Sequence, residues 1–118
     1  MSDQAEQTTP VVVVLPAEID VTNSELVHER IVAALTPGVD VVVADMTSTT
    51  FCDSSGVHAV IFAHEVAVTR GIELRLAVSP GGSVRRVLQL IGVGSVVPVY
   101  PSLAEAVDGA YGVSKKSP

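Results

Sequence analysis

The fold is decided by the stretch VDVVVADMTSTTFCDSSGVHAVIFAHEVAVT, residues 39–69. Within its first part, Val39–Met46, the uninterrupted apolar run Val41–Ala44 predicts a strand that is buried on both faces. Its last part, from Ser55 to about Thr69, is apolar around most of its circumference, which predicts a heavily covered helix. A buried strand followed by such a helix indicates an α/β domain.

The alternation of strand and helix continues on both sides of this stretch. Strands are predicted at Val11–Leu15, Ile72–Val78 and Val96–Tyr100, and extended chain or a turn at Ala17–Val21. Helices are predicted at residues 22–35, 84–91 and 102–110, and the apolar face of the first contains Val27, Ile31, Ala34 and Leu35. Capping-box spacing marks the first and the last of these, at Thr22 with Glu25 and at Ser102 with Glu105. Pro98 lacks an amide donor and confines the last strand to a sheet edge.

These elements predict one α/β domain over residues 11–110. We expect a mixed central β-sheet of about four to five strands, together with about four helices. Residues 1–10 are polar and are expected to form a disordered tail, and residues 111–118 a flexible C-terminal tail.

Composition excludes several classes of protein. The formal net charge of −6 and the isoelectric point near 4.8 argue against attraction to nucleic acid. The single cysteine, Cys52, excludes an intramolecular disulfide, and we expect it to be a small buried apolar residue. No apolar run reaches the ~18–20 residues that cross a membrane, and the polar start is not a signal peptide. We therefore expect a cytoplasmic protein that binds neither nucleic acid nor membrane.

The tetrapeptide Asp53-Ser54-Ser55-Gly56 stands at the predicted start of the second helix. Free amides and the positive end of the helix dipole favour negative charge there, so Ser54 can carry a phosphate without harm to the fold. Asp53 is expected to position the Ser54 hydroxyl or to bond nearby amides, and Gly56 to leave room for another protein. His58 lies one turn after Ser54 on the same helical face, where it either contacts the partner or is simply half-exposed.

Several short segments taken together resemble the STAS domain, and specifically the small stand-alone anti-sigma factor antagonists of bacteria. The similarity spans residues 11–108, and its segments are Ala17-Glu18-Ile19-Asp20, Phe51–Val57, Gly71–Leu74, Ser79-Pro80, Val84–Leu88 and Gly92-Val93. The sequence departs from the family pattern at Ala17, where glycine is usual, and at His58, where a small residue is usual. The turn at residues 79–83 also looks longer than usual.

The resemblance implies a protein that is not an enzyme and that works by binding. Family members bind an anti-sigma factor that is also a serine kinase, and thereby release a sigma factor. The kinase phosphorylates the serine after the motif aspartate, here Ser54, and a PP2C-type phosphatase reverses the modification. The resemblance also implies that Asp20, Asp53 and Ser55 line the surface that the partner contacts.

Other interpretations stay open on the sequence alone. Ser54 is alternatively only a helix N-cap, and the domain a STAS scaffold or a nucleotide-responsive regulator outside a sigma-factor pathway. A hydrolase with Ser54 as nucleophile is disfavoured, because neither a Gly-x-Ser-x-Gly elbow nor a recognisable Asp–His pair accompanies it. His58 and His64 are not spaced as a metal pair on one helical face, so no metal and no cofactor are expected. A weak homodimer is left open.

Overall fold

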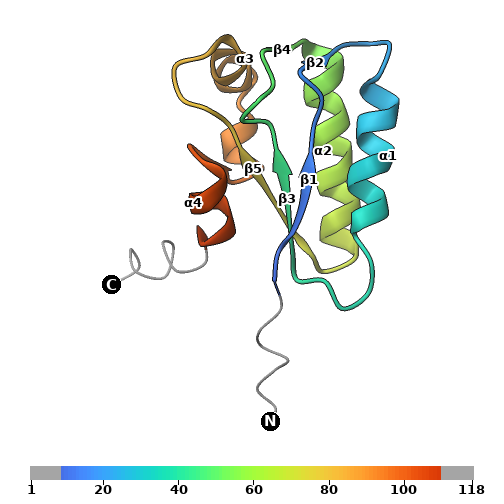
Figure 1. The fold of residues 1–118 in the computed structure, drawn as a ribbon. Coiled ribbons are helices and arrows are strands. Elements are labelled where there is room, and N and C mark those ends of the chain that lie inside the picture. Colours follow the sequence, from blue (N-terminus) through green and yellow to red (C-terminus); the bar gives the residue numbers. More distant parts are fainter. Residues whose placement is uncertain (1–8, 110–118) are drawn as a thin grey trace.

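The computed structural model describes residues 9–109, and its centre is a sheet of four parallel strands (Figure 1). The strand order is β1–β3–β5–β6, with β1 at Val11–Val14, β3 at Val41–Asp45, β5 at Glu73–Ala77 and β6 at Val99–Tyr100. The α/β class is thereby confirmed. The expected mixture of strand directions is not seen among residues 9–109, where every strand pair is parallel. Helical crossovers between the strands explain this, because each one returns the chain in the same direction.

A second, two-stranded ribbon stands beyond the carboxyl ends of β1 and β3 (Figure 1). It pairs β2, Glu18–Ile19, in parallel with β4, Phe51–Cys52. The sequence predicted extended chain or a turn for the first of these, and no strand for the second. Strands of two residues are too short to show a hydrophobic period, which is why β4 was missed.

Helices cover both faces of the sheet. On one face α1, Ser24–Ala34, and α2, Ser54–Thr69, pack side by side, while α4, Leu103–Val107, lies on the other (Figure 1). Beside β4 lies α3, Ser83–Ile91, which is followed by the short 3₁₀ helix η2, Val93–Ser95. None of the described helices is long and apolar enough to span a membrane. The tails expected at residues 1–10 and 111–118 lie outside the described residues, apart from Thr9 and Pro10.

The burial of β3 on both faces is confirmed. Val42 and Ala44 belong to the main core under α1 and α2, whereas Val43 belongs to a smaller core under α4. All three side chains are inaccessible to solvent. The uninterrupted apolar run of this strand therefore has a direct structural cause, since neither face of β3 meets water.

Two predictions about helices are corrected by the structure. The helix α2 is less completely covered than expected, because Phe62 and Val68 are 55% and 61% exposed. The first capping box is absent, because the N-cap of α1 is Asn23 and Thr22 instead donates to the Asp20 side chain. The apolar face predicted for α1 is correct, since its buried side chains are Val27 and Ile31.

The C-terminal part of the domain follows the sequence more closely. The Ser102 hydroxyl caps α4 by accepting from the Glu105 amide at 3.1 Å. The strand β6 lies at a sheet edge, as Pro98 requires, but it contains only Val99–Tyr100. It is shorter than predicted because η2 and its C-cap, Val96, occupy the preceding chain.

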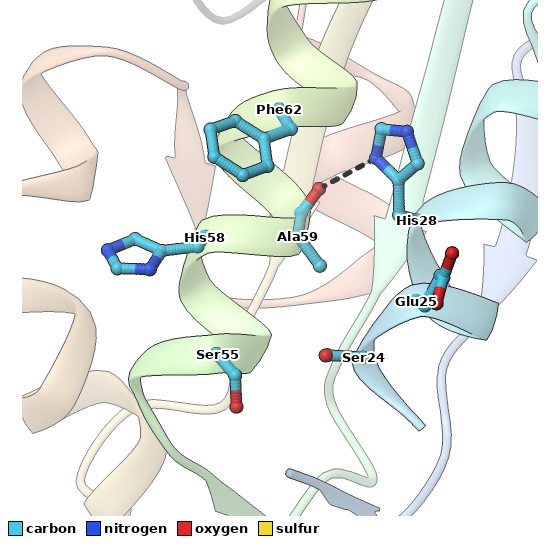
Figure 2. Close-up of a pocket in the computed structure, with 7 residues that line it drawn as sticks. All are labelled: Ser24, Glu25, His28, Ser55, His58, Ala59 and Phe62. Carbon is cyan, nitrogen blue, oxygen red and sulfur yellow. Dashed lines mark hydrogen bonds between the residues drawn. The ribbon is translucent and has the colours of Figure 1, made fainter. Parts of the chain in front are cut away.

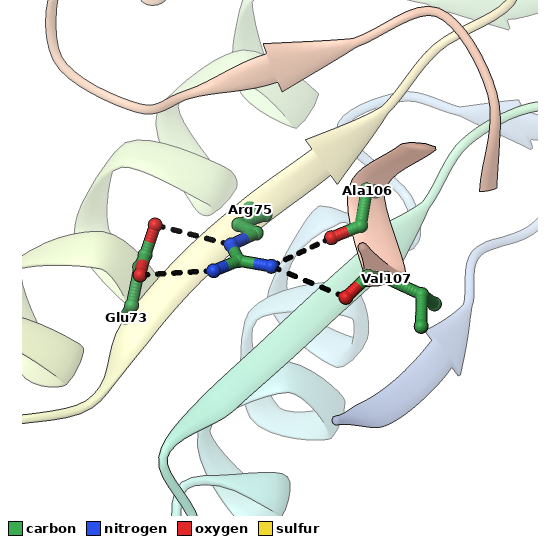
Figure 3. A network of polar contacts seen from close by, with 4 residues as sticks. All are labelled: Glu73, Arg75, Ala106 and Val107. Atoms are coloured by element: carbon green, nitrogen blue, oxygen red, sulfur yellow. Dashed lines mark hydrogen bonds and ion pairs between the residues drawn. The ribbon is translucent and has the colours of Figure 1, made fainter. Parts of the chain in front are cut away.

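A buried arginine ties α4 to the sheet (Figure 3). Arg75 on β5 is 3% exposed, and its Nη1 donates to the carbonyl oxygen of Ala106 at 2.8 Å. Its Nε and Nη2 donate to the two carboxylate oxygens of Glu73 at 3.1 and 3.3 Å. The guanidinium also lies over the Tyr100 ring, 5.9 Å from its centroid. One side chain thus satisfies a carbonyl at the end of α4 and keeps its own charge paired.

Replacing this arginine should loosen α4. Arg75→Met fills similar space but leaves the Ala106 carbonyl without its donor, so we expect a loss of about 1–3 kcal/mol in the free energy of unfolding. Urea denaturation followed by circular dichroism measures this loss. Glu73→Gln is the control, because the Glu73 side chain is 46% exposed and should cost less than about 1 kcal/mol. Equal losses in the two variants would contradict the role given to Arg75.

Candidate functional site

The start of α2 is capped by Asp53, not by either serine. One carboxylate oxygen, Oδ1 of Asp53, accepts from the amides of Ser55 and Gly56 at 2.9 and 3.2 Å. The same oxygen accepts from the Ser55 hydroxyl at 2.6 Å. Three donors on one oxygen fix the first turn of the helix and leave no capping role for Ser54.

Ser54 is the first residue of α2 and its side chain is exposed. Within residues 9–109 its hydroxyl makes no hydrogen bond. The fold therefore makes no use of this hydroxyl, and an enzyme approaching from solvent can reach it. Ser55, the next residue, is half-buried and held by Asp53, so the two serines have different surroundings.

The capping geometry also sets the charge state of Asp53. The hydrogen bond from the Ser55 hydroxyl is the largest cause that lowers the pKa of Asp53, and the amides of Gly56 and Ser55 act in the same direction. Partial desolvation opposes them. The carboxylate is consequently ionised at neutral pH, directly beside Ser54.

The ribbon of β2 and β4 brings Asp20 to this site. Ile19 pairs with Cys52, and the Asp53 amide donates to the Ile19 carbonyl at 3.1 Å, so Asp20 and Asp53 follow neighbouring strands. Asp20 is half-buried and closes the turn before α1, where its Oδ1 accepts from the Thr22 amide at 2.9 Å. The two aspartates lie near each other although 33 positions separate them in the sequence.

Gly56 lies inside the domain, not on the partner surface where it was expected. A Cβ at this position would stand 2.6 Å from the Cys52 Sγ and 2.7 Å from Cγ2 of Ile19. Glycine is therefore required for α2 to approach the ribbon this closely. Cys52 is buried as predicted, and burial, together with the Asp53 charge, raises the pKa of its thiol to about 11. The thiol stays protonated at neutral pH and is a packing group.

A groove of about 320 Å³ opens beside the serines, between the first turns of α1 and α2 (Figure 2). We name it the α1–α2 groove, and it is lined by Ser24, Glu25, His28, Ser55, His58, Ala59 and Phe62. His58 is exposed, and its ring stacks on that of Phe62 with centroids 6.2 Å apart. From α1, His28 reaches the Ala59 carbonyl oxygen with Nδ1 at 3.4 Å.

Sequence reasoning found the α2 side of this groove but missed the α1 side. It singled out Ser55 and His58, whereas Glu25 was taken as a capping residue and His28 was given no role. The i, i+4 spacing of Ser24 with His28, and of Ser55 with Ala59, was the available signal. The two helix faces meet because α1 and α2 pack together in the tertiary structure, and neither i, i+4 spacing predicts this contact.

The end of the molecule that carries Ser54 includes α3, which contacts β4 and carries Arg85 and Arg86, and two acidic segments. These segments, residues 15–29 and 45–58, contain no Lys or Arg. Their carboxylates are those of Glu18, Asp20, Glu25, Glu29, Asp45 and Asp53. A protein that docks here must offer positive or neutral side chains. Among residues 9–109 no group of three or more His, Cys, Asp or Glu side chains is arranged to hold a metal ion.

Adding one methyl group at Gly56 should disturb the site. Gly56→Ala overpacks the contact with Cys52 and Ile19, and we expect it to lower the free energy of unfolding by about 1–3 kcal/mol. Gly82→Ala is the matched control, because its Cβ would meet nothing within 4 Å and its φ is −92°. Thermal and urea denaturation compare the two. Equal stability of both variants would disprove the close packing described here.

The carboxylate at the N-cap predicts a pH-dependent stability. Because the folded state lowers the pKa of Asp53, its carboxylate stabilises the fold above the ordinary value of 3.8. That contribution is lost as the pH falls through the folded pKa. The variant Asp53→Asn keeps a hydrogen-bond acceptor at the N-cap, but its side chain does not titrate. The difference in melting temperature between the wild type and this variant should therefore be constant above about pH 5 and should decrease below it. Ser55→Ala removes the hydroxyl donor to Asp53, so the loss of stability should begin at a higher pH. If the wild type keeps the same advantage in melting temperature at acidic pH, the role given to the Asp53 carboxylate is wrong.

The chain is similar to a known domain family and to several solved structures. The family model described as the STAS domain matches residues 3–106. No curated protein sequence matches the chain. Among solved structures, the anti-sigma factor antagonist SpoIIAA in its unphosphorylated form is 27% identical, with a TM-score of 0.68 over 88% of this chain and 90% of that one.

Two further structures share the fold at lower identity. An anti-sigma factor antagonist from Mycobacterium paratuberculosis is 22% identical, with a TM-score of 0.75 over 86% of this chain and 85% of that one. A sulfate transporter family protein from Wolinella succinogenes is 16% identical, with a TM-score of 0.73 over 91% and 88%. The fold therefore occurs in regulators and in transporters alike. Because the family model covers most of its length, the chain belongs to the STAS domain family.

Proposed function

We propose that the protein is an anti-sigma factor antagonist whose binding is controlled by phosphorylation of Ser54. In the unmodified state it binds an anti-sigma factor that is also a serine kinase, and a sigma factor is released in the cytoplasm. The observation that carries this proposal is the exposed Ser54 hydroxyl, which the capping by Asp53 leaves unused. Similarity to SpoIIAA and to other anti-sigma factor antagonists supports the pathway.

A phosphate on Ser54 is compatible with the fold. The residue is at the first position of α2, where the helix dipole stabilises a negative group by roughly 0.3–1 kcal/mol. The carboxylate of Asp53 repels the phosphate from the other side, so the two effects partly cancel. Because the hydroxyl holds no other group in place, its modification breaks no contact within residues 9–109. The folded state should therefore change little.

Binding should change much more than folding. A phosphate adds about −1.5 to −2 charges, in addition to the carboxylates of Asp20 and Asp53. In a packed interface this dianion loses water and needs several donors that the partner does not present to a neutral serine. A loss of 2–3 kcal/mol already weakens binding about 30- to 150-fold. The modification thus acts on the interface and leaves the domain intact.

The neighbouring residues take supporting roles in this proposal. Asp53 and Ser55 hold the first turn of α2, so that Ser54 is presented in one conformation. Asp20, which follows the neighbouring strand, and His58, one turn further along α2, extend the contact surface around the serine. A PP2C-type phosphatase restores the binding state by removing the phosphate. No catalytic step is assigned to the protein itself.

The decisive experiment replaces the serine. Ser54→Asp should lose about 30-fold or more in affinity for the anti-sigma kinase, measured by calorimetry, with little change in melting temperature. Ser54→Ala should bind but accept no phosphate from ATP, whereas Ser55→Ala, the matched control, should still be phosphorylated at Ser54 by mass spectrometry. If Ser54→Asp binds as tightly as the wild type, the switch is wrong and a STAS scaffold role is favoured.

A further inference from the structure

The α1–α2 groove presents an aromatic wall that the fold does not use. Phe62 is 55% exposed, and its ring stacks with that of His58 at an interplanar angle of 28°. Both rings come from α2 and stand on one side of Ala59, whose small side chain leaves the hollow between the helices (Figure 2). Flat ring faces of this kind stack with planar groups.

The other wall of the groove is polar and bears one formal charge. On α1 it consists of Ser24, Glu25 and His28, and the Glu25 side chain is exposed (Figure 2). Within residues 9–109 no Lys or Arg forms a salt bridge with this carboxylate. The groove therefore combines aromatic faces, hydroxyl acceptors and an unneutralised negative charge.

Arginine satisfies all three features better than other side chains. Its planar guanidinium stacks on aromatic rings and pairs with a carboxylate through two parallel hydrogen bonds. Its aliphatic stem packs against apolar surface such as Ala59 and Phe62. Lysine offers a point charge without a plane, and an aliphatic side chain would leave the Glu25 charge without a partner.

We propose that the α1–α2 groove receives an arginine side chain of the partner protein. This inference rests on the proposed function and adds the chemistry by which the partner is recognised. Ser55 lines the groove and Ser54 precedes it in the same helical turn, so an arginine seated here brings the partner's surface to the phosphoacceptor. Glu25 is then a specificity-determining residue for a contact in which Ser54 is the switch.

The isolated protein tests this with a small probe. Nα-acetyl-arginine amide, titrated into ¹⁵N-labelled protein, should shift the amide resonances of Ser55, His58 and Phe62. Glu25→Gln should weaken this binding about 1.5- to fivefold, the range of an exposed ion pair. Glu29→Gln is the matched control, because it removes the same charge from α1 outside the groove lining and should leave the affinity unchanged.

Two further variants test the aromatic wall. Phe62→Ala should weaken probe binding about two- to fivefold, as the loss of a cation–π contact does at an exposed site. Val68→Ala, at another exposed apolar position of α2, should have no effect. The neutral citrulline analogue should not shift the same resonances. Equal shifts with citrulline, or equal weakening by Glu25→Gln and Glu29→Gln, would overturn the proposal.

A separate measurement distinguishes this inference from the proposed function. Ser54 does not line the groove, so Ser54→Ala should bind the probe as the wild type does. With the anti-sigma kinase as partner, Glu25→Gln should lose at least about tenfold in affinity while Glu29→Gln loses far less. Kinase binding that depends on Ser54 but not on Glu25 would reject the groove and leave the switch intact.

Discussion

The close approach of Gly56 to Ile19 and Cys52 is the constraint on which the site depends. The absence of a side chain at Gly56 lets the first turn of α2 press against the ribbon of β2 and β4. That contact fixes where α2 begins, and the Asp53 carboxylate then caps it. Once both are in place, the direction in which Ser54 points is no longer free. The exposed hydroxyl follows from the way its neighbours pack.

The four consecutive residues 53–56 consequently have different roles, some in the fold and one in the proposed function. Asp53 and Gly56 stabilise the helix start, one by accepting hydrogen bonds and the other by making room for packing. The Ser54 side chain is exposed, and its hydroxyl makes no hydrogen bond within the described residues. Ser55 joins the two sets, because it donates to Asp53 and also lines the α1–α2 groove. Under the proposed function, a charge added at Ser54 would alter the interface at small cost to the fold.

The opposite face of the sheet is built for stability. There Arg75 joins β5 to the end of α4, and a small core of Val43, Ala77 and Ala106 fills the space between them. Arg75 lies in the middle of β5, whereas the ribbon and the N-termini of α1 and α2 lie beyond the carboxyl ends of β1 and β3 (Figure 1). In open parallel sheets that end is the usual place for binding.

The sequence by itself determined the α/β class, the double burial of β3, the buried face of α1 and the edge position of β6. These follow from local patterns, since apolar runs, helical periodicity and a proline act within a few residues of where they occur. Only the tertiary structure decided that β4 pairs with β2, that Gly56 is a packing residue and that α1 supplies half of the groove. Each of these depends on segments distant in the chain. A two-residue strand or a single glycine shows no periodic pattern, so it cannot predict a contact with a residue dozens of positions away.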